Sequence, residues 1–332
     1  MLDSVNMKAT VSKEEFKKQS KLLKKELETL PQKIKAAKIP VIILFEGWGA
    51  AGKGSIISDL ILNFDPRGFK VYSTAEATET EKRHPLLWRH WQNLPEQGYM
   101  SILDRSWYQD VSIARVEDDL SDSETLHRMN SINTFERQLT DNGYLVLKFF
   151  LHIGQKEQRA RFEKLENDKN TAWRVTERDH WRNKHYNLLY SILDEMLEYT
   201  NTPNAPWHVV CSNDSQAALL SVYRTVVESV KEAIQAKEKG LTISSARGIP
   251  APKPFNLVHT PLLSEITLED KTIEPEKYKK ELAKLQKKLK GLHYKLYRRK
   301  VPVIVVYEGW DAAGKGGNIK RVSAALDPRG YE

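Results

Sequence analysis

The chain repeats itself at a fixed offset of 262 residues. The segment PVIILFEGWGAAGKG begins at Pro40, and PVIVVYEGWDAAGKG begins at Pro302. The same offset relates two copies of the sequence DPRG and maps the apolar stripe of a helix expected over 13–37 onto residues 278–296. A motif, an offset and a helical stripe that agree in this way indicate a duplicated domain of about 260 residues.

The second copy, 275–332, stops soon after its glycine-rich loop. A helix, a strand and a second helix are too little for an α/β core, so we expect either a longer natural protein of about 500 residues or a fragment. The first copy accounts for a domain at 1–237. Between the copies, residues 238–274 contain the sequence GIPAPKPF, which favours an extended linker.

Composition and charge argue against a membrane-spanning, secreted or disulfide-bonded protein. The net charge is +8, and residues 275–332 alone carry 15 Lys+Arg against 6 Asp+Glu. This basic stretch either attracts polyanions or is a solvated helix face. There is no apolar run of about 18 residues, no secretory signal, and a single cysteine, Cys211, which excludes an internal disulfide. We expect a cytoplasmic protein without membrane or nucleic-acid partners, and we also expect a homo-oligomer.

Short apolar runs alternate with helical patterns along the first copy. This alternation predicts an α/β fold with a parallel sheet and helices on both faces. Besides the first helix, one helix is expected over 84–93 and a long one over 176–200. Strands are expected at 41–46, 70–74, 100–103, 144–151 and 207–211.

The loop sequence GWGAAGKG after the first strand fits two motifs. It matches the dinucleotide fingerprint G-x-G-x-x-G and most of a P-loop, G-x-x-x-x-G-K. The second copy favours the P-loop, because Asp311 replaces Gly49 where a dinucleotide site needs glycine. Lys53 and Lys315 follow the last glycine in both copies, and an apolar strand ends at Asp104 in a Walker B pattern.

The two loops predict phosphate binding by backbone N–H groups and lysine. Gly54 and Gly316 stand where a P-loop usually has a hydroxyl, so Mg²⁺ must be held by carboxylates, for which Asp311 and Asp104 are the candidates. The first copy has neither the hydroxyl nor a loop carboxylate. The residues expected to bind phosphate are Gly47, Gly52, Gly54, Gly309, Gly314, Gly316, Lys320 and Arg321.

Basic residues near the loops have two interpretations. Lys320 and Arg321, where the first copy has Ser58 and Asp59, either bind a polyanionic phosphate or form a solvated face. The polar stretch 159–185 is either a charged surface hairpin or a lid whose arginines close over donor phosphates. The lid candidates are Arg159, Arg161, Arg174, Arg178 and Arg182.

The sequences EGWDAAGKGG, DPRG, HPLLWRHW, DRSWY and APWHVV together resemble the family-2 polyphosphate kinases. The duplicated layout resembles their two-domain branch, the polyphosphate:AMP phosphotransferases. The resemblance implies a thymidylate-kinase-like P-loop fold and Mg²⁺-dependent transfer of a terminal phosphate from inorganic polyphosphate to AMP, giving ADP. It implies activity mainly in the second domain, with Asp311 as a catalytic loop aspartate. The other catalytic candidates are Lys315, Lys53, Asp104 and Arg105.

Two other functions stay open. Because of Gly49 and Asp59, the first copy could instead be a non-catalytic domain that binds polyphosphate or supports assembly. The whole protein could instead be an ATP-dependent nucleoside monophosphate kinase. The 332-residue chain itself is expected to be weakly active or inactive, because its second loop has no Walker B partner.

Overall fold

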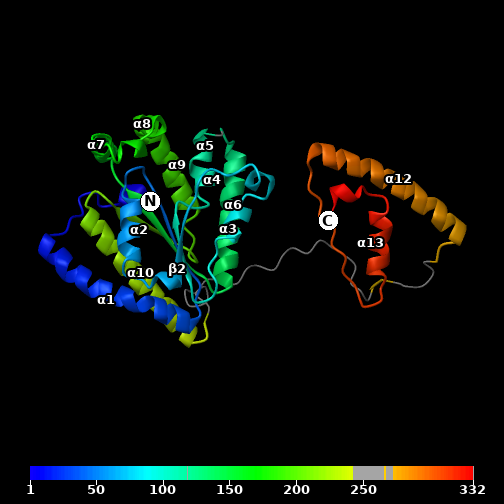
Figure 1. The fold of residues 1–332 in the computed structure, drawn as a ribbon, viewed down its shortest axis with the longest axis horizontal. Helices are drawn as coiled ribbons and strands as arrows, with labels where there is room; N and C mark the ends of the chain where they lie inside the picture. The colour runs from blue at the N-terminus through cyan, green and yellow to red at the C-terminus, as the bar shows by residue number, and fades with distance from the viewer. Residues whose placement is uncertain (118, 242–264, 267–271, 332) are drawn as a thin grey trace. The chain divides into compact units, whose positions relative to one another are not determined.

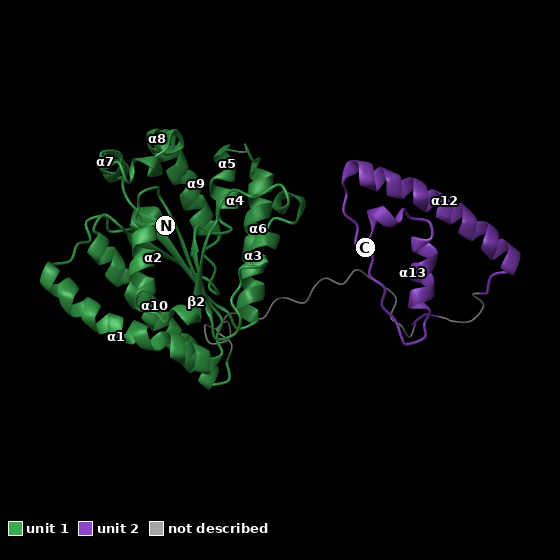
Figure 2. Ribbon diagram, in the orientation of Figure 1, with its two compact units in different colours: residues 1–252 green, residues 253–332 purple. Residues whose placement is uncertain are grey.

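The computed structural model describes residues 1–117, 119–241, 265–266 and 272–331 (Figure 1), so most of the linker expected at 238–274 lies outside the described residues. The chain divides into two compact units, Met1–Pro252 and Lys253–Glu332 (Figure 2). Within the described ranges, no helix has the length and apolarity needed to cross a membrane.

Unit 1 is built on a five-stranded parallel sheet in the order β2-β3-β1-β4-β5. The central strands β1 and β4 are buried almost throughout, as expected for strands covered on both faces. Val41 of β1 pairs with Met100 of β3 on one side and with Leu145 of β4 on the other. The strands are β1 (Val41–Gly47), β2 (Phe69–Ser73), β3 (Met100–Asp104), β4 (Leu145–His152) and β5 (Trp207–Cys211).

Helices cover both faces of this sheet, with α1, α2 and α10 on one side and α6 and α9 on the other (Figure 1). The predicted α/β class is therefore confirmed. α1 begins after Ser12, whose side chain accepts a hydrogen bond from the Glu15 N–H, and it buries Leu27, Leu30 and Ile34 against the core. The helices are α1 (Lys13–Ala37), α2 (Lys53–Ile61), α3 (Trp88–Trp91), α4 (Gln109–Ser112), α5 (Ala114–Glu117), α6 (Asp122–Asp141), α7 (Gln155–Glu166), α8 (Glu177–Lys184), α9 (Tyr186–Tyr199) and α10 (Ser215–Glu238).

Two helix predictions are wrong in extent. The helix expected over 84–93 is the single turn α3, because His84, which precedes Pro85, is extended (φ −103°, ψ 164°). The helix expected over 176–200 is broken at His185 (φ −99°, ψ 30°) into α8 and α9. The break arises because α8 is hydrogen-bonded to α7, whereas α9 stacks on the loop after β1.

Unit 2 contains α12 (Pro275–Arg299) and α13 (Lys315–Ser323). The strand expected between them is not formed: the backbone at 301–310 is irregular, and Ile304 is 89% exposed. The corresponding strand β1 in unit 1 is hydrogen-bonded to β3 and β4, and the described part of unit 2 contains no strand to pair with. Of two similar apolar segments, the one with partner strands forms a strand and the other does not.

A buried ion pair joins the middle of β4 to α6 in unit 1. The Lys148 ammonium on β4 donates to Glu136 Oε2 (2.8 Å), to the Tyr108 hydroxyl (2.9 Å) and to the Thr200 carbonyl (2.8 Å), and both charged side chains are fully buried. All three donors of the ammonium are satisfied, so the pair joins β4, α6 and the segment before α4.

Lys148→Met is expected to lower the free energy of unfolding by about 3–5 kcal/mol, because Glu136 would stay buried without its counter-charge. The double variant Lys148→Met/Glu136→Gln should recover part of this loss. Urea denaturation followed by circular dichroism measures both effects. A single variant as stable as the wild type would contradict the role given to this pair.

Candidate active site

The loop between β1 and α2 has two positions that only glycine fits well. Gly47 has φ 132°, and a Cβ there would lie 2.3 Å from the Leu151 carbonyl oxygen. Gly52 has φ 95° and precedes the first turn of α2. Gly49 and Gly54 do not have positive φ, so the backbone does not require glycine at either position. The backbone conformation therefore does not require glycine at Gly49, the middle glycine of the dinucleotide fingerprint.

The second loop has the same conformation without the sheet. Gly309 and Gly314 also have positive φ, and Ala312 (φ 60°) matches Ala50 (φ 58°). Lys53 Nζ donates to the Gly47 carbonyl (2.9 Å), and Lys315 Nζ makes the same bond to its own loop (2.7 Å). The local sequence alone therefore determines the conformation of the loop and the hydrogen bond of its lysine.

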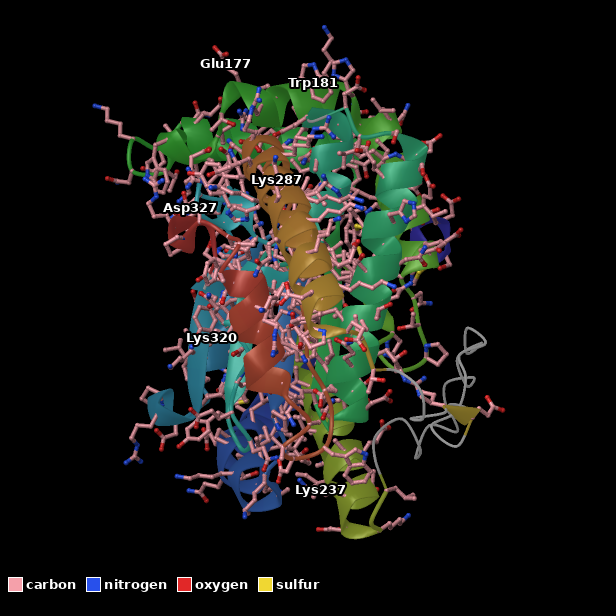
Figure 3. The ribbon with its side chains drawn as sticks, turned by 90° about the vertical axis from the view of Figure 1, so that its right-hand side faces the viewer. Glu177, Trp181, Lys237, Lys287, Lys320 and Asp327 are labelled. Atoms are coloured by element: carbon pink, nitrogen blue, oxygen red, sulfur yellow. The ribbon has the colours of Figure 1, made fainter. Side chains whose placement is uncertain are left out.

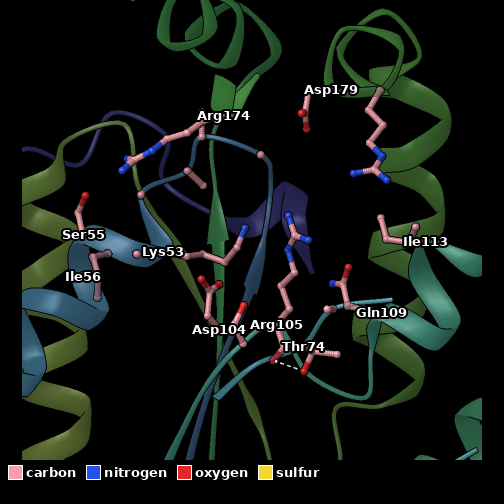
Figure 4. A pocket seen from close by; sticks show the side chains of 18 of the residues that line it. Lys53, Ser55, Ile56, Thr74, Asp104, Arg105, Gln109, Ile113, Arg174 and Asp179 are labelled. Carbon is pink, nitrogen blue, oxygen red and sulfur yellow. Dashed lines mark hydrogen bonds between the residues drawn. The ribbon is translucent and has the colours of Figure 1, made fainter. Parts of the chain in front are cut away.

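The first loop lines a cavity of about 2740 Å³ in unit 1. Lys53, Asp104 and Arg105 point into this space beneath Asp179 of α8 (Figure 4). Arg105 has φ 64°, a left-handed conformation that costs a non-glycine residue about 1–2 kcal/mol. Its N–H donates to the Phe45 carbonyl (3.0 Å), which holds the strained turn at the end of β3. Strain retained beside a phosphate loop is typical of functional sites.

Glu46, at the end of β1, was missed in the sequence, although Glu308 precedes the second loop in the same way. Burial raises the pKa of Glu46 to about 7, against the opposing effect of hydrogen bonds from Ser106 and of the nearby Lys53. The Ser106 N–H and hydroxyl donate to Glu46 Oε1 at 2.7 and 2.8 Å. Glu46 therefore ties the end of β1 to the turn after β3.

The charge of Lys53 is balanced by groups from several elements. Burial lowers its pKa, and so does the Arg105 guanidinium, whereas Asp104, Glu46 and Asp179 act in the opposite direction. Carboxylates from β1, β3 and α8 thus all raise the pKa of Lys53, the lysine that a P-loop directs at phosphate.

Among the predicted lid arginines, Arg161 fastens α7 to the loop. It donates to the carbonyls of Ala50 (3.1 Å) and Asn213 (3.1 Å). Arg159 is not among the residues that line the cavity. Arg174, Arg178 and Arg182 do line it; Arg174 stacks on Trp173, Arg178 pairs with Glu76 (2.9 Å), and Arg182 pairs with Glu117.

The predicted site residues of the second copy lie in unit 2. Asp311, Lys320 and Arg321 are exposed there, with Lys320 on α13 (Figure 3). Asp104, the other predicted metal ligand, belongs to unit 1 and lines its cavity. The described residues contain no group of three or more His, Cys, Asp or Glu side chains able to hold a metal ion. A single carboxylate such as Asp104 still fits Mg²⁺, because this ion is usually held by one or two carboxylates together with substrate phosphates.

Comparison with protein families matches residues 10–238 and 272–332 to polyphosphate kinase 2 (PPK2). A polyphosphate:AMP phosphotransferase of Pseudomonas aeruginosa is 32% identical over 336 residues, which cover all of this chain and 66% of that protein. One from Pseudomonas syringae is 33% identical over 89% of this chain and 58% of that protein. The chain thus spans about two thirds or less of the length of these relatives. The crystal structure of polyphosphate kinase 2 from Arthrobacter aurescens superposes with a TM-score of 0.67 at 28% identity, covering 70% of this chain and 85% of that one.

Glu46→Gln is expected to change how stability depends on pH. The folded-state pKa of about 7 lies above the ordinary value of 4.5, so ionisation of Glu46 costs stability as the pH rises through this window. Relative to the wild type, the variant should gain about 2 kcal/mol in free energy of unfolding between pH 5 and pH 7. Urea titrations at both pH values measure this, with Glu163→Gln on α7 as an exposed control. Parallel pH dependences for Glu46→Gln and the wild type would contradict the assignment.

Proposed function

The chain belongs to the polyphosphate kinase 2 family, and from this premise we propose that the whole protein transfers a terminal phosphate from inorganic polyphosphate to AMP, giving ADP. The observation that carries the proposal is the large cavity of unit 1, with a P-loop lysine, a Walker B aspartate and arginines on its walls. Two matched relatives bear the name polyphosphate:AMP phosphotransferase, which supports the choice of donor and acceptor.

In the proposed reaction the protein acts by positioning and charge stabilisation. The loop N–H groups and Lys53 or Lys315 hold the phosphate chain, as the N-terminus of a helix favours anions. In the first copy, Arg105 and the arginines of the α7–α8 lid offset negative charge on the bound phosphate chain. Mg²⁺ held by a loop or Walker B carboxylate would offset charge on the phosphates.

The two copies are proposed to have different functions in this reaction. The second loop carries Asp311, and the helix after it carries Lys320 and Arg321, whereas the first copy has Gly49 and Asp59 at two of these positions. These differences favour transfer in the second copy and phosphate-polymer binding without efficient turnover in the first. The proposal further includes a cytoplasmic homo-oligomer without nucleic-acid or membrane partners, and a 332-residue chain that is weakly active or inactive.

Asp311→Asn in the whole protein is expected to lower ADP formation from polyphosphate and AMP by about 100-fold or more, because the amide cannot replace a carboxylate beside the loop phosphates. Glu276→Gln, an exposed carboxylate of the same unit, is the matched control and should leave the rate unchanged. Undiminished ADP formation by Asp311→Asn would refute the assignment.

The same assay separates the competing donor. If polyphosphate is the donor, replacing it with ATP should lower the initial rate of ADP formation strongly. An equal or faster rate with ATP would favour an ATP-dependent nucleoside monophosphate kinase.

A further inference from the structure

The space above Gly49 is bounded by the lid. A Cβ added at Gly49 would lie 3.3 Å from Asp179 Oδ1, 3.5 Å from Phe162 Cζ and 3.6 Å from Gln158 Nε2. In the second copy the corresponding residue is Asp311, in a loop of the same conformation. A lid carboxylate in unit 1 thus lies beside the position from which the second loop extends its own carboxylate.

Asp179 is held in this position by α8 itself. The N–H and hydroxyl of Thr176 donate to Asp179 Oδ2 at 3.0 and 2.7 Å, which forms a capping box. Within the described part of the chain, Asp179 Oδ1 accepts no hydrogen bond. This oxygen lies on the side of Gly49 and can still accept a hydrogen bond or bind a cation.

The lid is also fastened to the loop. Gln158 Nε2 donates to the Gly49 carbonyl (3.2 Å), and Asn183 of α8 donates to Gln158 Oε1 (2.9 Å). These bonds fix α7 and α8 over the loop and set the distance between Asp179 and Gly49. The capping box occupies Oδ2 of the carboxylate and leaves Oδ1 on the side of Gly49.

We propose that Asp179 supplies, from the lid, the carboxylate that the first loop lacks at Gly49, and that it makes phosphate-chain binding at Lys53 depend on a divalent cation. The inference rests on the proposed function. A carboxylate beside bound phosphates repels them unless a cation lies between the two, and Mg²⁺ is commonly held by one or two carboxylates together with substrate phosphates. Asp179 is therefore a specificity-determining residue that selects the metal-loaded phosphate chain.

The test measures binding of tripolyphosphate to the 332-residue chain by calorimetry, with Mg²⁺ and with EDTA. All proteins carry Lys315→Ala, so that the first loop dominates the signal. Asp179→Asn keeps an oxygen for the Thr176 bonds and removes the free carboxylate oxygen. Glu177→Gln changes a neighbouring carboxylate that projects outward from α8 (Figure 3) and is the matched control.

With Asp179 intact, Mg²⁺ should tighten binding, and in Asp179→Asn this enhancement should shrink by about tenfold or more. The control should keep the enhancement, and the double variant Gly49→Asp/Asp179→Asn should restore it. An unchanged enhancement in Asp179→Asn, or no restoration in a double variant with an unaltered melting temperature, would overturn the inference alone. Absence of tripolyphosphate binding with Asp179 intact would overturn the proposed role of the first copy as well.

Discussion

The close approach of Gly47 to the backbone of Leu151 is the constraint on which the site depends. No residue with a Cβ can occupy that position, because the added atom would lie 2.3 Å from the Leu151 carbonyl oxygen. The contact lets β1 turn beside β4 directly into the loop, and the Gly47 carbonyl then accepts a hydrogen bond from Lys53 (2.9 Å). The second loop makes the same lysine bond without this contact, so the contact places the loop and its N–H groups at the end of β1 and beside β4, whereas the local sequence sets their conformation.

The segment DRSWY joins the site to the core. Asp104 and Arg105 line the cavity, whereas Trp107 Nε1 and the Tyr108 hydroxyl donate to buried Glu136 at 3.0 and 2.7 Å. Glu136 is the partner of Lys148, so the buried ion pair also fixes the turn that aims Arg105. Asp104 and Arg105 of this motif thus face the cavity, whereas Trp107 and Tyr108 belong to the core. A change that destabilises the core around Glu136 is therefore expected to disturb the cavity as well.

The sequence predicted the sheet, the extent of α1 and the choice of a P-loop, because each depends on local periodicity or on comparing the two copies. It did not predict the break at His185 or the place of Asp179, because both depend on contacts between segments far apart in the chain. The irregular backbone at 301–310 has the same origin: an apolar run predicts a strand only when partner strands can pair with it.

We propose that the two loops, which share one conformation, differ in function because their surroundings differ in charge. Replacing Lys53 and Lys315 by Ala, one at a time, in the whole protein and measuring ADP formed from polyphosphate and AMP tests it most directly. We expect Lys315→Ala to lower the rate by about 100-fold or more and Lys53→Ala to leave most of it. A loss confined to Lys53→Ala, or equal losses in both variants, would contradict the account.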